Sequence, residues 1–228
     1  MIESATGLVL RTRRLTESSL IIHWLTPNLG RVATVAKGAL RPKSPFRGKV
    51  DLFYLGDFSF VRSRRSELHT LREVSVRETY PAIRRELGRL QQASYAAALV
   101  EQVTEAETPL VEIFGLVQGF LVALANIAPQ PHLLFAFELK VLAELGLEPD
   151  LAKSRVSAGA REIVKMLSRQ DWSAISKLKT SSAQADELRQ FLHGFMIFHL
   201  GKIPSGRFAA ANGEAGLQSL PPPIRFAP

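Results

Sequence analysis

The first eighty residues alternate between apolar and polar positions as short β-strands do. Residues 7–13 read GLVLRTR, which sets Leu8 and Leu10 out of phase with Arg11 and Arg13. Four further apolar or aromatic runs follow, at residues 19–25, 31–36, 50–61 and 67–76. The first two of these flank a turn that contains Pro, Asn and Gly, as a hairpin requires. Five short strands joined by loops predict a small barrel of the OB type.

After Pro81 the apolar positions recur every three or four residues, which is the helical period. A first helix is expected at Pro81, and further helices at residues 91–105, 109–125, 132–145, 159–168 and 183–203. In the last of these, Phe191, Phe195 and Phe198 form a stripe that we expect to face the core.

These patterns predict an α+β protein with a barrel domain at residues 1–80 and an all-helical domain at residues 81–207. A barrel of eighty residues buries only about 60–65% of its unfolded surface, so we expect it to dock on the helices. Residues 208–228 are rich in Ala, Gly and Pro and are expected to form a disordered tail.

Charge is distributed unevenly between the two predicted domains. The chain has 228 residues and a formal net charge of +8. Residues 1–80 carry 14 Lys and Arg against 7 Asp and Glu, whereas residues 81–228 carry 15 against 14. Residues 31–49 contain six cations and no acid. This asymmetry indicates a polyanion-binding barrel attached to a nearly neutral partner, although a solvated basic face without a ligand is the plain alternative.

Several classes of protein are disfavoured. The chain has no cysteine, which excludes disulfides, thiol catalysis and cysteine–zinc sites. It contains no phosphate-binding loop, no dinucleotide fingerprint and no nucleophile elbow, and its five histidines are scattered. No apolar run is long enough to span a bilayer. We therefore expect no catalytic residue, no cofactor, no bound metal and no membrane association, and a cytoplasmic location.

One long segment carries a family resemblance. Residues 7–44 run from GLVLRTRRLTESS to AKGALRPKS, and they resemble the N-terminal domain of the RecO family of bacterial recombination mediators. That family typically shows AKGARRPKS, so Leu40 replaces one basic position. Weaker likeness returns at residues 145–151 and at FHLG and SGR near residue 207. Many relatives carry a cysteine module after the second block, and its absence here removes the expectation of zinc.

The resemblance implies an OB-fold domain, a helical domain and a mediator function in DNA repair and recombination by the RecF pathway. It implies binding of single- and double-stranded DNA, annealing of complementary strands, and contacts with RecR and single-strand-binding protein, with RecA as an indirect partner. Such a protein would be cytoplasmic and associated with the nucleoid.

OB barrels bind single strands with a cationic groove and stacking aromatic rings. The candidate DNA-binding residues are therefore the cations of the predicted strands and loops and one loop aromatic: Arg11, Arg13, Arg31, Lys37, Arg41, Lys43, Phe46, Arg47, Lys49, Arg62, Arg64 and Arg65. Phe46 is the preferred stacking residue because it sits inside the polar loop. Trp24 and Phe53 lie in dense apolar runs and are expected in the core.

The helical domain is expected to brace the barrel and to receive protein partners. An acidic peptide that ends in Phe requires an apolar pocket beside a cation, and the candidates near helices are Arg84, Arg85, Arg89, Lys140 and Arg189. From residues alone, two alternatives stay open: an OB-type RNA or ribosome-associated factor, and an adaptor for acidic peptides. An enzyme is the least favoured class.

Overall fold

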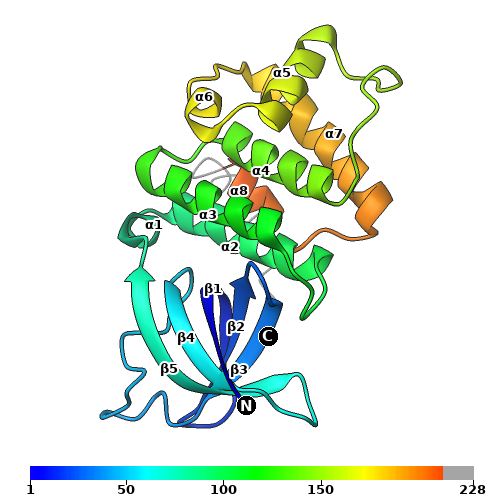
Figure 1. Ribbon diagram of the computed structural model, residues 1–228. Coiled ribbons are helices and arrows are strands. Elements are labelled where there is room, and N and C mark those ends of the chain that lie inside the picture. Colours follow the sequence, from blue (N-terminus) through cyan, green and yellow to red (C-terminus); the bar gives the residue numbers. More distant parts are fainter. Residues whose placement is uncertain (213–228) are drawn as a thin grey trace, which may run out of the picture.

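The computed structural model of the protein describes residues 1–212. Figure 1 shows the β-barrel in one half of the molecule and the helices in the other half, packed over one end of the barrel. The end of the barrel that faces away from the helices is called the free end below. Among the described residues, none of the helices combines the length and apolar content that a membrane span needs.

The barrel consists of five strands that close in the order β1-β2-β3-β5-β4. The strands are β1 (Ile2–Arg14), β2 (Leu20–Thr26), β3 (Gly30–Ala36), β4 (Leu55–Val61) and β5 (Leu68–Glu78). Strands β3 and β5 are parallel, all other neighbours are antiparallel, and β4 pairs with β1 to complete the ring. The predicted five-stranded barrel and the α+β class are confirmed.

Apolar side chains from alternate strand positions fill the barrel. The ring of Trp24 stacks on that of Phe58 with 4.2 Å between the centroids. The indole N–H of Trp24 donates a 2.9 Å hydrogen bond to the Thr34 hydroxyl, so the one polar atom of this side chain is satisfied. Trp24 is 1% exposed, which confirms its expected place in the core.

Strand β4 begins at Leu55, five residues later than predicted. The apolar residues before it belong to a loop that is buried without being a strand. Phe53 has a left-handed φ of 64°, and its N–H donates a 2.8 Å hydrogen bond to the carbonyl of Val9. Its ring lies in the core, as expected, in the apolar cluster that the barrel shares with the helices.

The helical part contains eight helices within the described residues. They are α1 (Pro81–Arg85), α2 (Leu87–Val103), α3 (Val111–Asn126), α4 (Pro131–Glu144), α5 (Ala158–Arg169), α6 (Trp172–Ser176), α7 (Ser182–Leu200) and α8 (Arg207–Asn212). Helix α4 is buried on nearly all sides and forms the centre of this part, in contact with α2, α3 and α5 to α8. Helix α6 was not predicted.

The phenylalanine stripe of α7 reaches the core only in part. Leu188, Leu192 and Met196, spaced four apart, are fully buried. Phe191 and Phe195 pack beside them, but Phe198 is 83% exposed, so the prediction of a core position for Phe198 is wrong. At 100° per residue, position 198 lies about 120° around the helix from Leu192, the middle of the fully buried row, and so on the solvent side.

Helix α8 corrects the predicted start of a disordered tail at residue 208. The guanidinium of Arg207 donates hydrogen bonds of 2.6 and 2.8 Å to the two oxygens of Glu138, which is wholly buried. The Tyr95 hydroxyl donates to the same carboxylate at 2.8 Å. Burial alone would lower the pKa of Arg207, but the hydrogen bonds to Glu138 and its negative charge outweigh this and raise the pKa above its ordinary value. The remainder of the predicted tail, residues 213–228, lies outside the described residues.

The barrel docks on the helices, as expected, through a shared apolar core that includes Leu8 and Leu25. The linker between α2 and α3 also lies along the start of β3. The N–H of Glu107 donates to the carbonyl of Arg31 at 3.0 Å. Gly30 has a φ of +64°, and a Cβ at this position would lie 1.9 Å from the carbonyl oxygen of Thr108. Glycine is therefore required where the linker crosses β3.

Candidate nucleic-acid interface

The segment between Lys37 and Lys49, called the basic loop below, leaves β3 at the free end of the barrel (Figure 1). It is folded as a series of tight turns. The N–H of Arg41 donates to the carbonyl of Gly38 at 3.1 Å, and the N–H of Ser44 donates to the carbonyl of Arg41 at 3.0 Å. Two further turns of the same kind follow. The cations of this loop are therefore carried on an ordered backbone.

The turn between β1 and β2 holds the beginning of the basic loop. The N–H of Gly38 donates to the Ser19 hydroxyl at 3.3 Å, and the N–H of Leu40 donates to the carbonyl of Ser18 at 2.9 Å. Gly38 has a φ of 67°, a conformation that glycine adopts without steric cost. Two parts of the segment 7–44, the Ser-Ser pair and the start of the AKGALRPKS motif, are thus hydrogen-bonded to each other.

Phe46 is buried, which corrects its predicted role in base stacking. Its side chain is 7% exposed and packs in the barrel core with Val9, Trp24 and Phe60. The polar residues around Phe46 gave no sign of its burial. The loop folds back on the barrel, and its one aromatic ring packs into the barrel core. Phe46 therefore anchors the basic loop.

The cations of the basic loop point to solvent. The exposed set is Lys37, Arg41, Lys43, Arg47 and Lys49. Arg47 donates to the carbonyl of Pro42 at 3.1 Å, and no carboxylate of residues 1–212 forms an ion pair with any of the five. An exposed cation without a carboxylate partner retains its charge for an anionic ligand.

Two predicted DNA-binding residues instead hold the barrel to the helical part. The guanidinium of Arg31 donates a 2.7 Å hydrogen bond to the carbonyl of Thr104. Arg62 donates to Glu3 at 2.6 Å and to Glu107 at 2.8 Å. The bond to Glu3 raises the pKa of Arg62 and lowers that of Glu3. We therefore remove Arg31 and Arg62 from the candidate DNA contacts.

The four other predicted cations of the barrel are exposed and stay candidates: Arg11, Arg13, Arg64 and Arg65. Arg11 is 57% exposed and lies 3.9 Å from a carboxylate oxygen of Glu101. That distance is long for an ion pair, so Arg11 also remains available to a ligand.

Arg72 is a candidate that the sequence reasoning missed. Ser59 pairs with Glu73 and Phe60 pairs with Leu71, so Arg72 is the extra residue of a bulge in β5. A bulge redirects the side chain of its unpaired residue. Two polar residues in succession, Arg72 and Glu73, interrupt the alternation of this strand, and this interruption was the only sign of a bulge. The strand carries no excess of basic residues, so its charge did not single out Arg72.

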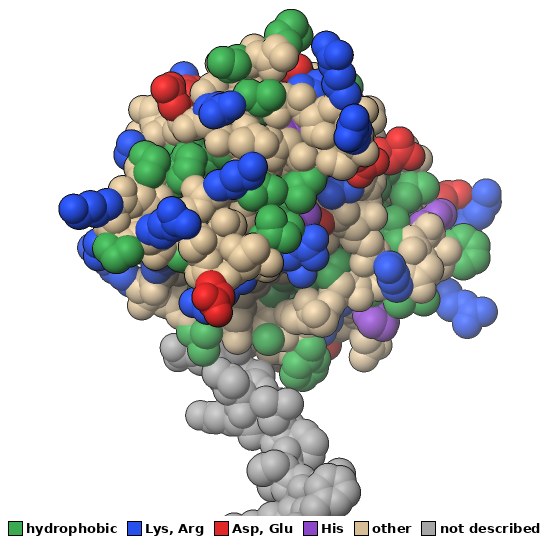
Figure 2. All heavy atoms as spheres, turned by 90° about the horizontal axis from the view of Figure 1, so that it is seen from below, with side chains coloured by type: hydrophobic (Ala, Val, Ile, Leu, Met, Phe, Trp, Pro, Cys, Tyr) green, Lys and Arg blue, Asp and Glu red, His purple; other side chains and the backbone are tan. Residues whose placement is uncertain are grey.

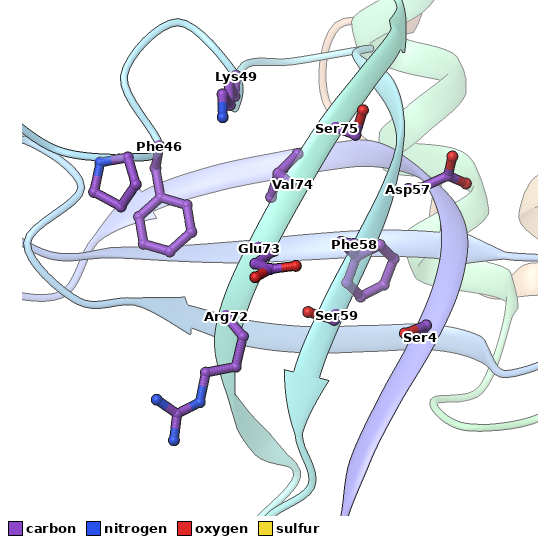
Figure 3. Close-up of a pocket in the computed structure, with 11 residues that line it drawn as sticks. Ser4, Phe46, Lys49, Asp57, Phe58, Ser59, Arg72, Glu73, Val74 and Ser75 are labelled. Atoms are coloured by element: carbon purple, nitrogen blue, oxygen red, sulfur yellow. The ribbon is translucent and has the colours of Figure 1, made fainter.

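Arg72 and Lys49 flank a hollow of about 460 Å³, called the β5 hollow below. Figure 3 shows Arg72 on β5, Lys49 on the basic loop and the ring of Phe46 beside β5. Seen from below in Figure 2, the molecule presents Lys and Arg side chains spread among apolar ones, with few acidic side chains between them. This surface suits an extended anionic ligand.

Two family sequence models match the chain. The one described as "Recombination protein O N terminal" matches residues 1–80, and the one described as "Recombination protein O C terminal" matches residues 84–156. The chain belongs to the RecO family. The first match coincides with the barrel and its basic loop, and the second covers α2, α3 and α4.

Individual RecO relatives agree with this. The DNA repair protein RecO of Anaeromyxobacter dehalogenans strain 2CP-C is 36% identical over 146 residues, which are 64% of this chain and 58% of the relative. That of Rhodopirellula baltica is 31% identical over 172 residues, 74% of this chain and 62% of the relative. That of Pelotomaculum thermopropionicum is 36% identical over 156 residues, 68% and 60% of the two chains. The matches span about three-fifths of these RecO proteins.

The five cations suggested for partner docking lie in different surroundings. Arg84 is bonded to Leu52 and Asp51 in the barrel loop, Arg89 to Glu86 and to two carbonyls of α3, and Lys140 to the carbonyl of Ser168. Arg85 is exposed on α1. Only Arg189, among these five, lies beside a mainly apolar hollow, which measures about 430 Å³.

Metal-ligating side chains do not gather in the described part of this RecO chain. No group of three or more His, Asp or Glu residues is placed to hold an ion within residues 1–212.

Proposed function

We propose that the protein is a non-catalytic recombination mediator that binds and anneals single-stranded DNA during DNA repair. In this role it also helps to load recombinase onto strands coated with single-strand-binding protein. Family membership supports the class of function, and the relatives named above are DNA repair proteins. The observation that carries the proposal is the set of five exposed cations on the ordered basic loop of a barrel.

The chemistry of these cations suits a phosphate backbone. Lys and Arg neutralise phosphates and release condensed counterions, which drives binding to any sequence. Nothing in the basic loop is built like a helix that reads base edges, so we propose that binding is sequence-tolerant. Double-stranded DNA presents the same phosphates and is a second ligand in this proposal.

The test is fluorescence-monitored annealing of complementary strands coated with cognate single-strand-binding protein. The wild-type protein should accelerate annealing, and R41A/K43A/R47A should lose most of this acceleration. The matched control R155A/R169A/K177A removes three exposed cations of the helical part and should anneal like the wild type. If the wild type gives no acceleration, the proposed function is wrong. A matched RNA pair annealed equally well would favour the RNA-factor alternative.

We also propose that the hollow beside Arg189 receives the acidic C-terminal peptide of single-strand-binding protein. Ile197, Ile203 and Phe208 supply its apolar lining, and Arg189 supplies a cation next to them. Arg189 forms a surface ion pair with Asp186, so a peptide carboxylate would compete with Asp186 for it. RecR and, indirectly, RecA are the other proposed partners, and work on chromosomal DNA would place the protein at the nucleoid.

Anisotropy of a labelled peptide with that acidic, Phe-ending sequence tests this docking site. R189A and I197D should each weaken binding, whereas R85A, which removes an exposed cation elsewhere, should not. Equal binding by all three variants would rule out this hollow.

A further inference from the structure

Three hollows adjoin one another around the free end of the barrel, because each shares a lining residue with the next. The β5 hollow, with Arg72 and Lys49, shares Phe46 with a second hollow of about 470 Å³ that contains Arg41 and Arg47. The second hollow shares Arg41 with a third of about 400 Å³, which adds Lys37. The cations thus follow one path, called the end track below: Arg72, Lys49, Arg47, Arg41 and Lys37.

The barrel offers no exposed aromatic ring along this path. Every Phe, Trp and Tyr of residues 1–80 is buried except Tyr54, which is half-buried and lies under the guanidinium of Arg84, 4.8 Å from its ring centroid. The exposed apolar side chains that line the hollows are Leu15, Leu40 and two prolines, Pro42 and Pro45, and none of them is aromatic. Barrels that hold single strands by stacking place aromatic rings at the surface, and this barrel has turned its rings inward.

We infer that the end track binds a single strand by its phosphates and leaves the bases facing outward, free to pair. Five cations on an ordered loop and on β5 can neutralise successive phosphates, while the missing rings leave the bases without a stacking partner on the protein. A strand held in this way is presented to its complement. The inference rests on the proposed function and adds to it the path of the strand, the orientation of its bases, and Arg72 as a contact.

Two carboxylates lie near the end track, and they differ in their effect on an anionic ligand. Asp57 is already satisfied, because it accepts hydrogen bonds from Thr6 at 2.7 Å and from Arg77 at 2.6 Å. Glu73 is exposed, lines the β5 hollow and opposes an anionic ligand there. Removal of the Glu73 charge should therefore tighten DNA binding. E73Q thus tests whether the strand passes through the β5 hollow by an increase in affinity, whereas the other variants test it by a decrease.

The path is tested by titrating labelled oligothymidylate with the full-length protein across a salt series. One lost phosphate contact lowers the slope of log affinity against log salt by about 0.7 on a single strand, or about fivefold in affinity at 0.1 M salt. R72A should show this loss. R155A is the control, an exposed arginine of the helical part away from the track, and it should bind like the wild type. E73Q should bind more tightly.

Base orientation is tested by permanganate oxidation of the thymines at saturating protein. Outward-facing bases should react at nearly the free-strand rate, whereas bases stacked on protein should be protected. Protection of the thymines, or equal binding by R72A and R155A, would overturn the inference. If the wild type still binds DNA in that case, the proposed function stands. If the wild type binds no DNA at all, it is the proposed function that fails.

Discussion

The N–H of Leu40 donates a 2.9 Å hydrogen bond to the carbonyl of Ser18, and this bond ties the basic loop to the turn between β1 and β2. Phe46 fixes the middle of the same loop in the barrel core. Arg84 holds the segment that follows it through a 2.6 Å hydrogen bond to the carbonyl of Leu52. The exposed cations therefore sit on a connection that is held at three points. Such a connection presents charge at fixed positions, and a free tail would not.

The buried ring of Phe46 gives the first prediction. F46L keeps most of the apolar volume but removes the ring, so it should cost about 1–2 kcal/mol of stability and leave DNA binding nearly unchanged. F46A should cost about 3–5 kcal/mol and weaken binding, because the loop loses its anchor. Urea unfolding and oligonucleotide titration measure the two effects. If F46L alone lowers DNA affinity more than tenfold, Phe46 stacks on a base and the anchoring role is wrong.

The contact between Gly30 and the linker at Thr108 gives the second. G30A should destabilise the protein by more than the roughly 1–2 kcal/mol that a left-handed alanine costs, because its Cβ would overlap the Thr108 backbone. The control is G48A, at a φ of +71° with open space around it, which should show only the conformational cost. Hydrogen exchange at the Glu107 amide should rise in G30A and not in G48A. Equal destabilisation by the two would contradict the close contact.

The buried pair of Arg207 and Glu138 gives the third. R207A leaves a buried carboxylate without its cation and should cost about 3–5 kcal/mol in urea unfolding. The double variant E138M/R207M should recover most of this loss, because the uncompensated charge is gone. R77A breaks an exposed ion pair and should cost about 0–1 kcal/mol. A cost of less than 1 kcal/mol for R207A would show that α8 does not depend on this pair.

The pH dependence of stability provides the fourth. Burial lowers the pKa of His23 from its ordinary 6.5, and Arg11, Arg13 and Arg31 lower it further, although Glu101 lies 3.8 Å from Nδ1. Below pH 6.5 the unfolded chain therefore takes up a proton that the folded protein resists, and stability falls as the pH drops. H23Q should lose this part of the fall between pH 6.5 and 5.

Glu101 acts with the opposite sign, because burial raises its pKa and the stability linked to its protonation is lost as the pH rises. Comparison of H23Q with the wild type isolates the histidine. The exposed-histidine variant H193Q serves as the control and should follow the wild type. A pH profile of H23Q identical to the wild type would contradict the assignment.

Local patterns were enough to predict the strands and most helices, because alternation and helical period record which face of an element is buried. They failed where an apolar run is buried without regular structure, as at Phe53, and where a helix is too short to show a period, as in α6 and α8. An apolar run cannot by itself distinguish a buried strand from a buried loop.

The candidate site was predictable only in its local part. The cations of the basic loop are neighbours in sequence, and the structure keeps them together and exposed. Arg31 and Arg62 resemble them in sequence, but their partners Thr104 and Glu107 are 73 and 45 residues away. Arg72 joins the site only because β5 and the basic loop line the same hollow, with Arg72 and Lys49 at its two ends (Figure 3). Such pairings depend on how the chain closes into a barrel and docks, which no local pattern records.

The salt dependence of single-strand binding tests the central claim most directly. Five phosphates neutralised on a single strand predict that log affinity falls with log salt with a slope of about −3.5. R41A/K43A/R47A, which removes Arg41 and Arg47 from the five cations of the end track, should reduce the slope to about −2.1 for every sequence tested, with an unchanged unfolding midpoint. A wild-type slope near zero, or a slope that the triple variant leaves unchanged, would contradict the account.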